Sequence, residues 1–426
     1  KIVTLSGKWE QLSNANKLSA NGVINFGTFL STTARTVYIW GAQLTQSAKP
    51  LPYVKTLAST ATQTFTETLR VEYDPATGEN LGALIEGGST NLCKGSENII
   101  AGPAFSMNAT SVTINASIAP DGTFSADKLI PTAVDDTHSI TVAQNTIASP
   151  STAAVSFYVK PAGYNFFSIG SGLTATEFAT FDLQSGTISQ TGSGTDESEC
   201  SIKPVGNGFY RVSVSLRPSI SGSTYAGPIP SGTLGWRPSF TGDGVSGVYA
   251  WGAQFEAQPF ATSYIRTEGS AVSRSSDNLS LPASGNMPPH NKEFTLNIDF
   301  AINGLPSGNA YLYDNGIDGG VVRFSRLSST GTTIAADGAS SGTVINNPAT
   351  INEKINHIIT RKDNNTVTTW YLEKVEKGGV SIAPSSNNWP SFSVGSTKTF
   401  SQHINGHISK LSTYAQALTA QEITLL

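Results

Sequence analysis

Apolar and polar side chains alternate along much of this sequence. In Phe209–Leu216, apolar residues at Tyr210, Val212, Val214 and Leu216 alternate with arginine and serine. A period of two indicates a β-strand with one buried face. No stretch shows the period of 3.6 that marks an amphipathic helix, so we predict an all-β fold. Further strands are predicted at 155–160, 177–183, 294–300, 320–327, 355–362, 366–375 and 406–414.

One strand sequence occurs twice. Val37–Leu44 returns as Val248–Phe255, and each copy is followed by a tyrosine, an aliphatic residue, a base and a threonine, at Tyr53–Thr56 and Tyr264–Thr267. An internal repeat of this kind marks a repeated structural module. We therefore expect residues 1–60 to be the C-terminal part of a truncated sandwich module, in a chain that is the distal part of a longer protein.

The phase of the repeated strand suggests its role. Strict alternation would place Tyr249, Trp251, Ala253 and Phe255 on one face. Because that face is apolar throughout, we interpret the strand as the one that closes the core of a sandwich. Stacking of Trp251 on a sugar is the alternative.

The end of the chain carries two local signals. A phase shift within 406–414 predicts a β-bulge. Thr419 and Glu422 have the spacing of a capping box, and Leu418 and Ile423 that of a hydrophobic staple, so a short helix should follow.

These patterns divide the chain into tandem antiparallel β-sandwich (jelly-roll) modules. After residues 1–60 we expect a connector over 61–90, in which 74–80 forms a turn because it contains proline and glycine at the positions that a turn favours. A jelly-roll sandwich should occupy 91–267, and a further sandwich 268–426.

Composition excludes several classes of protein. Charged residues make up 13% of the 426 residues, against about 25% in typical soluble domains. A net charge of −4 supplies no basic stripe for nucleic acid. No apolar run approaches the roughly 20 residues that span a bilayer. Cys93 and Cys200 could pair or remain free thiols, and such low cysteine use fits assembly in a reducing cytoplasm.

The motifs of common enzymes are missing, so we expect no catalysis. The sequence contains no nucleophile elbow, P-loop or dinucleotide-binding fingerprint. Asp196, Glu197 and Glu199 cluster, but a solvated acidic loop explains them better than the carboxylate pair of a glycosidase. His403 and His407 have the spacing of zinc ligands on a helix, but the surrounding pattern is that of a strand or turn.

No cofactor is expected, with calcium as the one exception. The segment 314–320 places Asp314 and Asp318 in a glycine-rich loop whose oxygen ligands would suit Ca²⁺. It lacks the length and the closing glutamate of an EF-hand. A hairpin turn is the alternative.

Glycan contact would use aromatic side chains outside the strand patterns, with polar residues as hydrogen-bond partners. Edge packing or an oligomer contact is the alternative for each. The candidates are Tyr164, Tyr225, Trp236, Arg237 and Trp389.

Three segments resemble phage tail and fibre proteins. Arg70–Glu79, with the Leu81–Glu86 and Thr90–Leu92 segments, is similar to a connector that precedes a carbohydrate-binding-module-like jelly roll in phage virion proteins. Ala119–Thr123 with Ala126–Leu129 is similar to an early strand of that jelly roll, in which this chain has Phe105 near the place of a usual tryptophan. The repeated strand with the tyrosine and threonine that follow it resembles the last strand of the same module. The last module resembles concanavalin-like (laminin-G or pentraxin-type) lectin domains, through Gly406, Ile408, Leu411, Tyr414, Ala417–Thr419 and Glu422–Ile423.

The resemblance implies a phage virion fibre protein that binds host cell-surface glycans without catalysis. Its implied partners are that glycan, other virion proteins and two further copies in a homotrimer, without nucleic acid or membrane insertion. The implied location is the virion, assembled in the host cytoplasm. A purely structural virion fibre or decoration protein is one alternative, and a secreted glycan-active enzyme is another.

Overall fold

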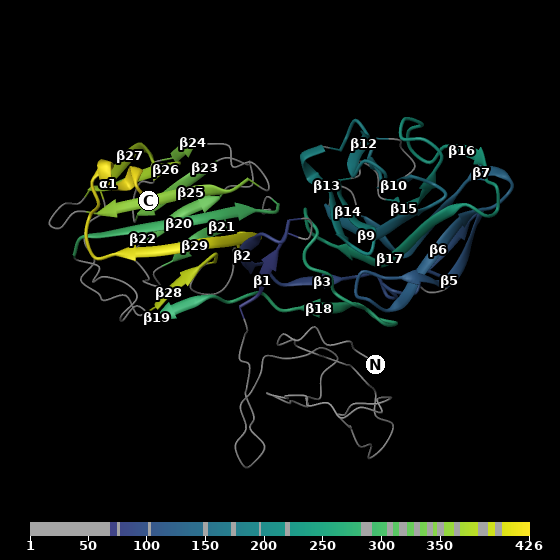
Figure 1. The fold of residues 1–426 in the computed structure, drawn as a ribbon, viewed down its shortest axis with the longest axis horizontal. Helices are drawn as coiled ribbons and strands as arrows, with labels where there is room; N and C mark the ends of the chain where they lie inside the picture. The colour runs from purple at the N-terminus through teal and green to yellow at the C-terminus, as the bar shows by residue number, and fades with distance from the viewer. Residues whose placement is uncertain are drawn as a thin grey trace, which may run out of the picture. The chain divides into compact units, whose positions relative to one another are not determined.

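The computed structural model consists almost entirely of antiparallel strands (Figure 1), which confirms the predicted all-β class. The first copy of the repeated strand and the expected truncated module lie outside the described residues. The described residues are 69–74, 77–100, 104–147, 152–171, 176–195, 197–217, 222–282, 292–304, 310–314, 322–327, 333–338, 344–346, 353–361, 367–381, 391–396 and 403–426.

Two six-stranded sheets form the first described sandwich. Sheet 1 has the order β12 (Thr187–Thr191), β11 (Phe178–Asp182), β10 (Phe166–Ser171), β15 (Gly222–Ile229), β8 (Ser139–Ile147) and β4 (Phe105–Asn108). Sheet 2 has the order β13 (Cys200–Gly206), β14 (Phe209–Leu216), β9 (Ala153–Ala162), β17 (Gly247–Glu256), β6 (Phe124–Pro131) and β5 (Thr110–Ile118).

Alternation predicted the inward faces of β9 and β14 correctly. Val155, Phe157 and Val159 are buried in the core between the two sheets, and so are Val212 and Val214. Phe105, at the place where the resembling proteins have a tryptophan, is also buried in this core. Core packing is therefore its role.

The repeated strand, β17, corrects one prediction. Val248, Ala250, Ala253 and Phe255 face the core, whereas Trp251 faces outward from sheet 2. The pairing register of β17 with β9 shifts between Trp251 and Gln254, and Gly252 lies there in the left-handed region at φ +61°. An extra residue at such a β-bulge inverts the alternation, so the predicted shared face does not exist.

Trp251 is nevertheless a packing residue. Its ring lies 4.8 Å from that of Tyr264 and 5.3 Å from that of Tyr158, in a second apolar cluster on the outer face of sheet 2. Only 3% of Trp251 is exposed. The indole therefore has no face free for a sugar.

Buried polar side chains hold the segment that follows the repeated strand in place. The Gln254 amide nitrogen donates to the carbonyl of Thr262, and its oxygen accepts from the backbone of Ile265. Asn91 bonds the carbonyls of Ala253 and Ile265 in the same way. These bonds fix the tail that carries Tyr264 against the end of β17.

The second described sandwich pairs a seven-stranded sheet with a six-stranded one. Sheet 3 has the order β1 (Val71–Tyr73), β2 (Asn80–Ile85), β29 (Gly406–Tyr414), β20 (Phe294–Ile302), β25 (Ile355–Arg361), β26 (Val367–Leu372) and β27 (Val375–Ser381). Sheet 4 has the order β19 (Ser280–Pro282), β28 (Ser391–Val394), β21 (Ala310–Asp314), β22 (Val322–Leu327), β23 (Thr333–Gly338) and β24 (Val344–Asn346).

The segment expected as a connector supplies strands to sheet 3. The turn predicted at 74–80 joins β1 to β2, with Gly78 at φ +73°, and β2 pairs with β29. A two-stranded pair, β3 (Ser89–Asn91) with β18 (Val272–Arg274), follows. Residues 69–85 therefore belong to the same sheet as the end of the chain.

The C-terminal signals are confirmed. Asp299 pairs with Lys410 and Phe300 with Ile408, so β29 has one extra residue between these two pairs. This is the bulge predicted within 406–414. Thr419 caps α1 (Ala420–Thr424) in a complete capping box with Glu422. The staple residues Leu418 and Ile423 are buried together against sheet 3.

The prediction of a single strand over 366–375 is wrong. The segment forms two strands, β26 and β27, joined at Glu373 and Lys374, whose φ angles are +49° and +62°. Two consecutive residues in the left-handed region make a tight hairpin turn, and the absence of glycine or asparagine at this turn hid it in the sequence.

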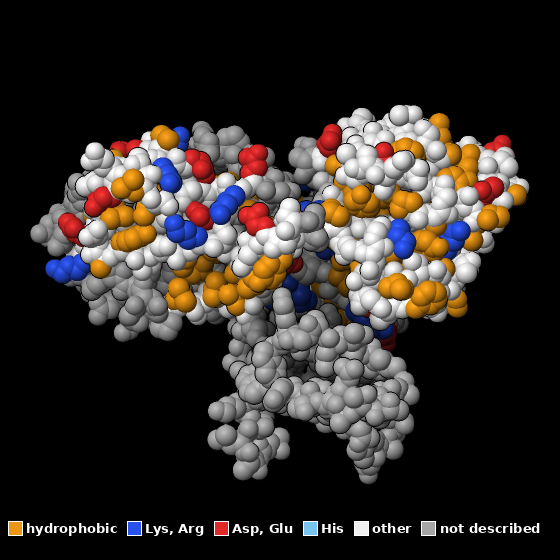
Figure 2. Space-filling view, in the orientation of Figure 1, with side chains coloured by type: hydrophobic (Ala, Val, Ile, Leu, Met, Phe, Trp, Pro, Cys, Tyr) orange, Lys and Arg blue, Asp and Glu red, His pale blue; other side chains and the backbone are white. Residues whose placement is uncertain are grey.

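Charged side chains are scattered over the face shown in Figure 2, with both signs interspersed. Neither Cys93 nor Cys200 forms a disulfide within the described residues, and burial raises the pKa of Cys93 to about 11. Within the described ranges, no helix is long and apolar enough to cross a bilayer.

Candidate functional site

A loop crosses the outer face of sheet 1. It runs from Ser231 to Pro238, between β15 and β16 (Ser239–Thr241), and β16 pairs with β7 (Asp135–Thr137). Its start is fixed by Ser189, whose hydroxyl donates to the carbonyl of Gly232, and by the side chain of Gln190, which accepts from the backbone of Gly235. The loop therefore lies across β12 before it reaches the centre of the sheet.

Trp236 packs on the sheet at a glycine. Its indole stacks on Phe178, with ring centroids 5.9 Å apart, and meets Tyr225 edge-on at 6.2 Å. A Cβ atom at Gly170 would lie 2.5 Å from the indole, closer than real Cβ atoms approach other atoms. The missing side chain at Gly170 is thus what lets the indole lie on β10.

Arg237 lies next to Trp236 and above β15. Its guanidinium carbon is 3.9 Å from the ring centroid of Tyr225, and Nη2 donates to the Thr137 hydroxyl at 3.2 Å. The Arg237 backbone has φ +46°, in the left-handed region that few non-glycine residues adopt. Such outliers gather at functional sites.

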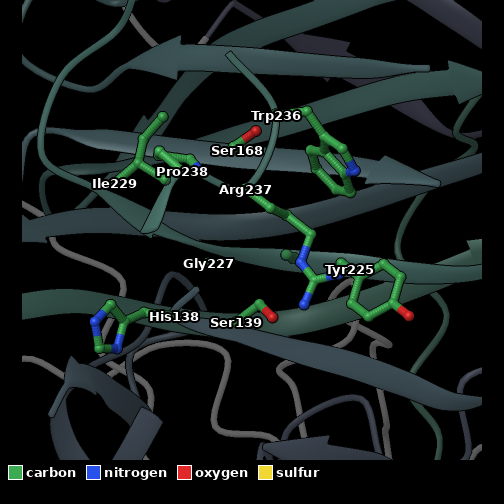
Figure 3. Close-up of a pocket in the computed structure, with 10 residues that line it drawn as sticks. His138, Ser139, Ser168, Tyr225, Gly227, Ile229, Trp236, Arg237 and Pro238 are labelled. Atoms are coloured by element: carbon green, nitrogen blue, oxygen red, sulfur yellow. The ribbon is translucent and has the colours of Figure 1, made fainter. Parts of the chain in front are cut away.

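Together these residues border a small hollow on sheet 1, shown in Figure 3. Its cavity volume is about 10 Å³, room for about one water molecule and far below the roughly 300–1,000 Å³ of sites for drug-sized ligands. A larger ligand would therefore lie on the open surface above these residues. It is lined by His138, Ser139, Ser168, Tyr225, Ala226, Gly227, Ile229, Trp236, Arg237 and Pro238.

Two polar atoms at the hollow, the Ser139 hydroxyl and Arg237 Nε, are buried and have no hydrogen-bond partner in the part of the chain that the structure describes. His138 is 4% exposed, and its ring nitrogens lie 2.5 Å from the carbonyl oxygen of Ala109 and 2.7 Å from that of Phe240. Since Phe240 belongs to β16, His138 fixes the far end of the loop.

The structure brings together three of the five predicted glycan-contact residues, namely Tyr225, Trp236 and Arg237. Tyr164 is elsewhere, with its ring 5.8 Å from that of Phe240 and packed against the core. Trp389 lies outside the described residues.

Sequence reasoning missed His138, Ser139 and Ser168. Ser139 and Ser168 alternate with the core residues Ile140 and Ile169 on their strands, so strand phase places them on the outer face. That phase could not show that β8 and β10 both flank β15.

The other candidate sites have structural partners. Glu199 pairs with Arg217, and Asp196 lies outside the described residues. His403 bonds the carbonyl of Asp277, and His407 lies 2.8 Å from Glu72. Within the described ranges, no group of histidine, cysteine and acidic residues could hold a metal ion.

The loop expected to bind calcium is described only at its start. Asp314 is buried at the end of β21, and Asp318 lies outside the described residues. A calcium site there stays a prediction.

Residues 273–424 match the family described as the concanavalin A-like lectin/glucanases superfamily, of laminin-G type. A concanavalin A-like lectin/glucanase domain is present over these residues. Its family name covers both lectins and glucanases, so this domain is compatible with either role. No curated protein matches the chain.

Solved structures similar to this chain include sialidases. A Trypanosoma rangeli sialidase in complex with sialic acid is 17% identical, at a TM-score of 0.28, over 32% of this chain and 22% of its own. A mutant of that enzyme that displays trans-sialidase activity is 17% identical, at a TM-score of 0.28, over 31% of this chain and 22% of its own. NanB is a sialidase of Streptococcus pneumoniae. Its structure with optactamide is 14% identical, at a TM-score of 0.28, over 35% of this chain and 26% of its own.

These matches correct the expected function. The named proteins are glycan-active enzymes, not virion components, so the prediction of a non-catalytic virion fibre, structural or adhesive, is wrong. No finding supports the virion partners or the homotrimer that the same resemblance implied. This chain spans about a quarter of the length of those sialidases or less, and at these TM-scores the likeness assigns it no activity.

Proposed function

We propose that this chain is the glycan-binding part of a glycan-active protein, and that the hollow at the 231–238 loop is one of its binding sites. One observation carries the proposal. Tyr225, Trp236 and Arg237 have side chains of the types that contact sugars, and they converge on the outer face of one sheet. The lectin-type domain at 273–424 supports it.

The chemistry of the hollow fits a saccharide. Aromatic rings stack on the apolar faces of sugar rings, and hydroxyl and guanidinium groups bond their hydroxyls. Among the described residues, the buried hydroxyl of Ser139 has no hydrogen-bond partner. A ligand hydroxyl at that position would satisfy it, which favours a polar ligand over an apolar one.

Trp236→Ala tests the proposal. We expect the variant to bind saccharides about tenfold more weakly, because a buried tryptophan at a binding site typically contributes more than about 1 kcal/mol. A glycan array identifies the saccharides bound by the wild-type chain, and titration calorimetry then compares the variants. Counting reducing ends after incubation shows whether the bound saccharide is also cleaved.

Phe124→Ala is the matched control. Phe124 is an aromatic residue of the same sandwich that is 64% exposed on β6, in the sheet opposite the hollow. Its loss should leave binding unchanged. Thermal unfolding must show that Trp236→Ala is folded, because Trp236 covers Phe178. A folded Trp236→Ala chain that binds as the wild type does, or a wild-type chain that binds no saccharide, would contradict the proposal.

A further inference from the structure

The guanidinium of Arg237 is held in place by uncharged groups, and it pairs with no carboxylate among the described residues. Stacking on Tyr225, the bond to Thr137 and the constrained backbone together restrict its side chain. A side chain that is already ordered loses little conformational entropy when a ligand binds. Among the described residues, no ion pair involves Arg237, and its Nε has no hydrogen-bond partner.

The two acidic residues that precede Thr137, the residue to which Arg237 donates, bond to other groups. Asp135 accepts from Ser239, and Asp136 accepts from Asn108 and the backbone of Thr137. These two carboxylates reduce the local positive potential, but neither forms an ion pair with Arg237. Arg217 and Arg266 of this sandwich have carboxylate partners in Glu199 and Glu97. Arg237 shares with Arg211 a stacked tyrosine and the lack of an ion pair among the described residues, but of these two only Arg237 lines the hollow.

An arginine fork of this kind matches the geometry of a carboxylate, which it can bind through two parallel hydrogen bonds. We infer that the hollow recognises a carboxylate-bearing saccharide, with the acid group on Arg237 and a sugar ring against Tyr225 and Trp236. This inference rests on the proposed function and names the ligand class for the same site.

An array of acidic oligosaccharides, each printed beside its own methyl ester, tests this directly. Esterification removes the charge and keeps the ring and its hydroxyls. We expect the wild-type chain to prefer the acids, and Arg237→Gln to bind them roughly 10- to 100-fold more weakly, as the loss of a hydrogen bond to a charged group implies. Arg237→Lys should recover only part of the affinity, because it keeps the charge but loses the fork.

Arg217→Gln is the matched control, since it removes one positive charge from the same sandwich away from the hollow. It should keep the preference for acids. Binding of the acids should also weaken as salt is raised, because ions screen exposed charges.

The possible failures can be told apart. Equal binding of acids and esters that is lost in Trp236→Ala would overturn the acidic ligand and leave glycan binding standing. A preference for acids that survives in folded Arg237→Gln would place the anion site elsewhere and overturn the inference. No binding of any saccharide would overturn both proposals.

Discussion

The position of Trp236 depends on the absence of a side chain at Gly170. Gly170 lies under the indole in β10, with its φ outside the left-handed region, so alanine would fit its backbone but not its surroundings. The new Cβ would lie 2.5 Å from the indole and 2.6 Å from the Cβ of Phe178. Trp236 would have to move, and overpacking of this kind costs about 1–3 kcal/mol.

We therefore expect Gly170→Ala to weaken saccharide binding about as much as Trp236→Ala does, roughly tenfold. Calorimetry on the best array ligand measures this, with thermal unfolding as the check on folding. Gly87→Ala is the control, because the nearest atom to a Cβ there is 3.7 Å away. Weaker binding in Trp236→Ala with unchanged binding in Gly170→Ala would show that this glycine does not position the indole.

Residue type and context predicted part of the candidate site. Trp236 and Arg237 lie between a glycine and a proline, outside any alternating pattern, and that marked them as loop residues. Ser139 and Ser168 carry no such mark, since outward-facing serines are common throughout the strands. Only the long-range pairing of β10 with β15 and of β15 with β8 brings them beside the loop.

At the scale of elements, alternation predicted strands well and failed where a bulge intervened. β9 and β14 follow the predicted phase, whereas β17 changes phase at Gly252. The sequence contains the glycine, but glycine in a strand can also mark a close approach or a weak strand. Alternation did predict the bulge in β29, because there the apolar pattern itself changes phase.

The bulge gives a prediction of its own. A Cβ at Gly252 would lie 2.7 Å from the Tyr158 ring, in addition to the strain of φ +61°. We expect Gly252→Ala to lower the free energy of unfolding of this sandwich by about 1–3 kcal/mol. Gly244 has a similar φ of +70° with no atom within 4 Å, so Gly244→Ala measures the backbone strain alone. Urea denaturation should show a larger loss for Gly252, and equal losses would mean that the ring accommodates the new atom.

At the scale of the molecule, the two sandwiches have separate apolar cores. One lies between sheets 1 and 2, and the other between sheets 3 and 4, with no buried residue in common. The sequence predicted the two sandwiches from strand counts and turns. It did not predict that β1 and β2 would pair with β29, because a pairing between segments over 300 residues apart leaves no local pattern.

Acid should destabilise one core selectively. His357 is 1% exposed in sheet 3, and burial lowers its pKa to about 3 from an ordinary value near 6.5. Burial also lowers the pKa of His403 in the same sandwich. Between pH 6.5 and 3 the unfolded chain binds a proton at His357 that the folded chain does not, so the stability present above pH 6.5 is lost as the pH falls. At pH 5 the loss is about 2 kcal/mol.

In the other sandwich, burial raises the carboxylate pKa of Asp127 and of Glu177. These groups add stability as the pH falls, which is the opposite sign. Calorimetric scans at pH 7 and pH 5 should therefore show two unfolding transitions, of which the one belonging to sheets 3 and 4 moves to lower temperature. His357→Gln should reduce that movement and leave the other transition where it is. If both transitions shifted equally, or the variant kept the full shift, His357 would not be the group responsible.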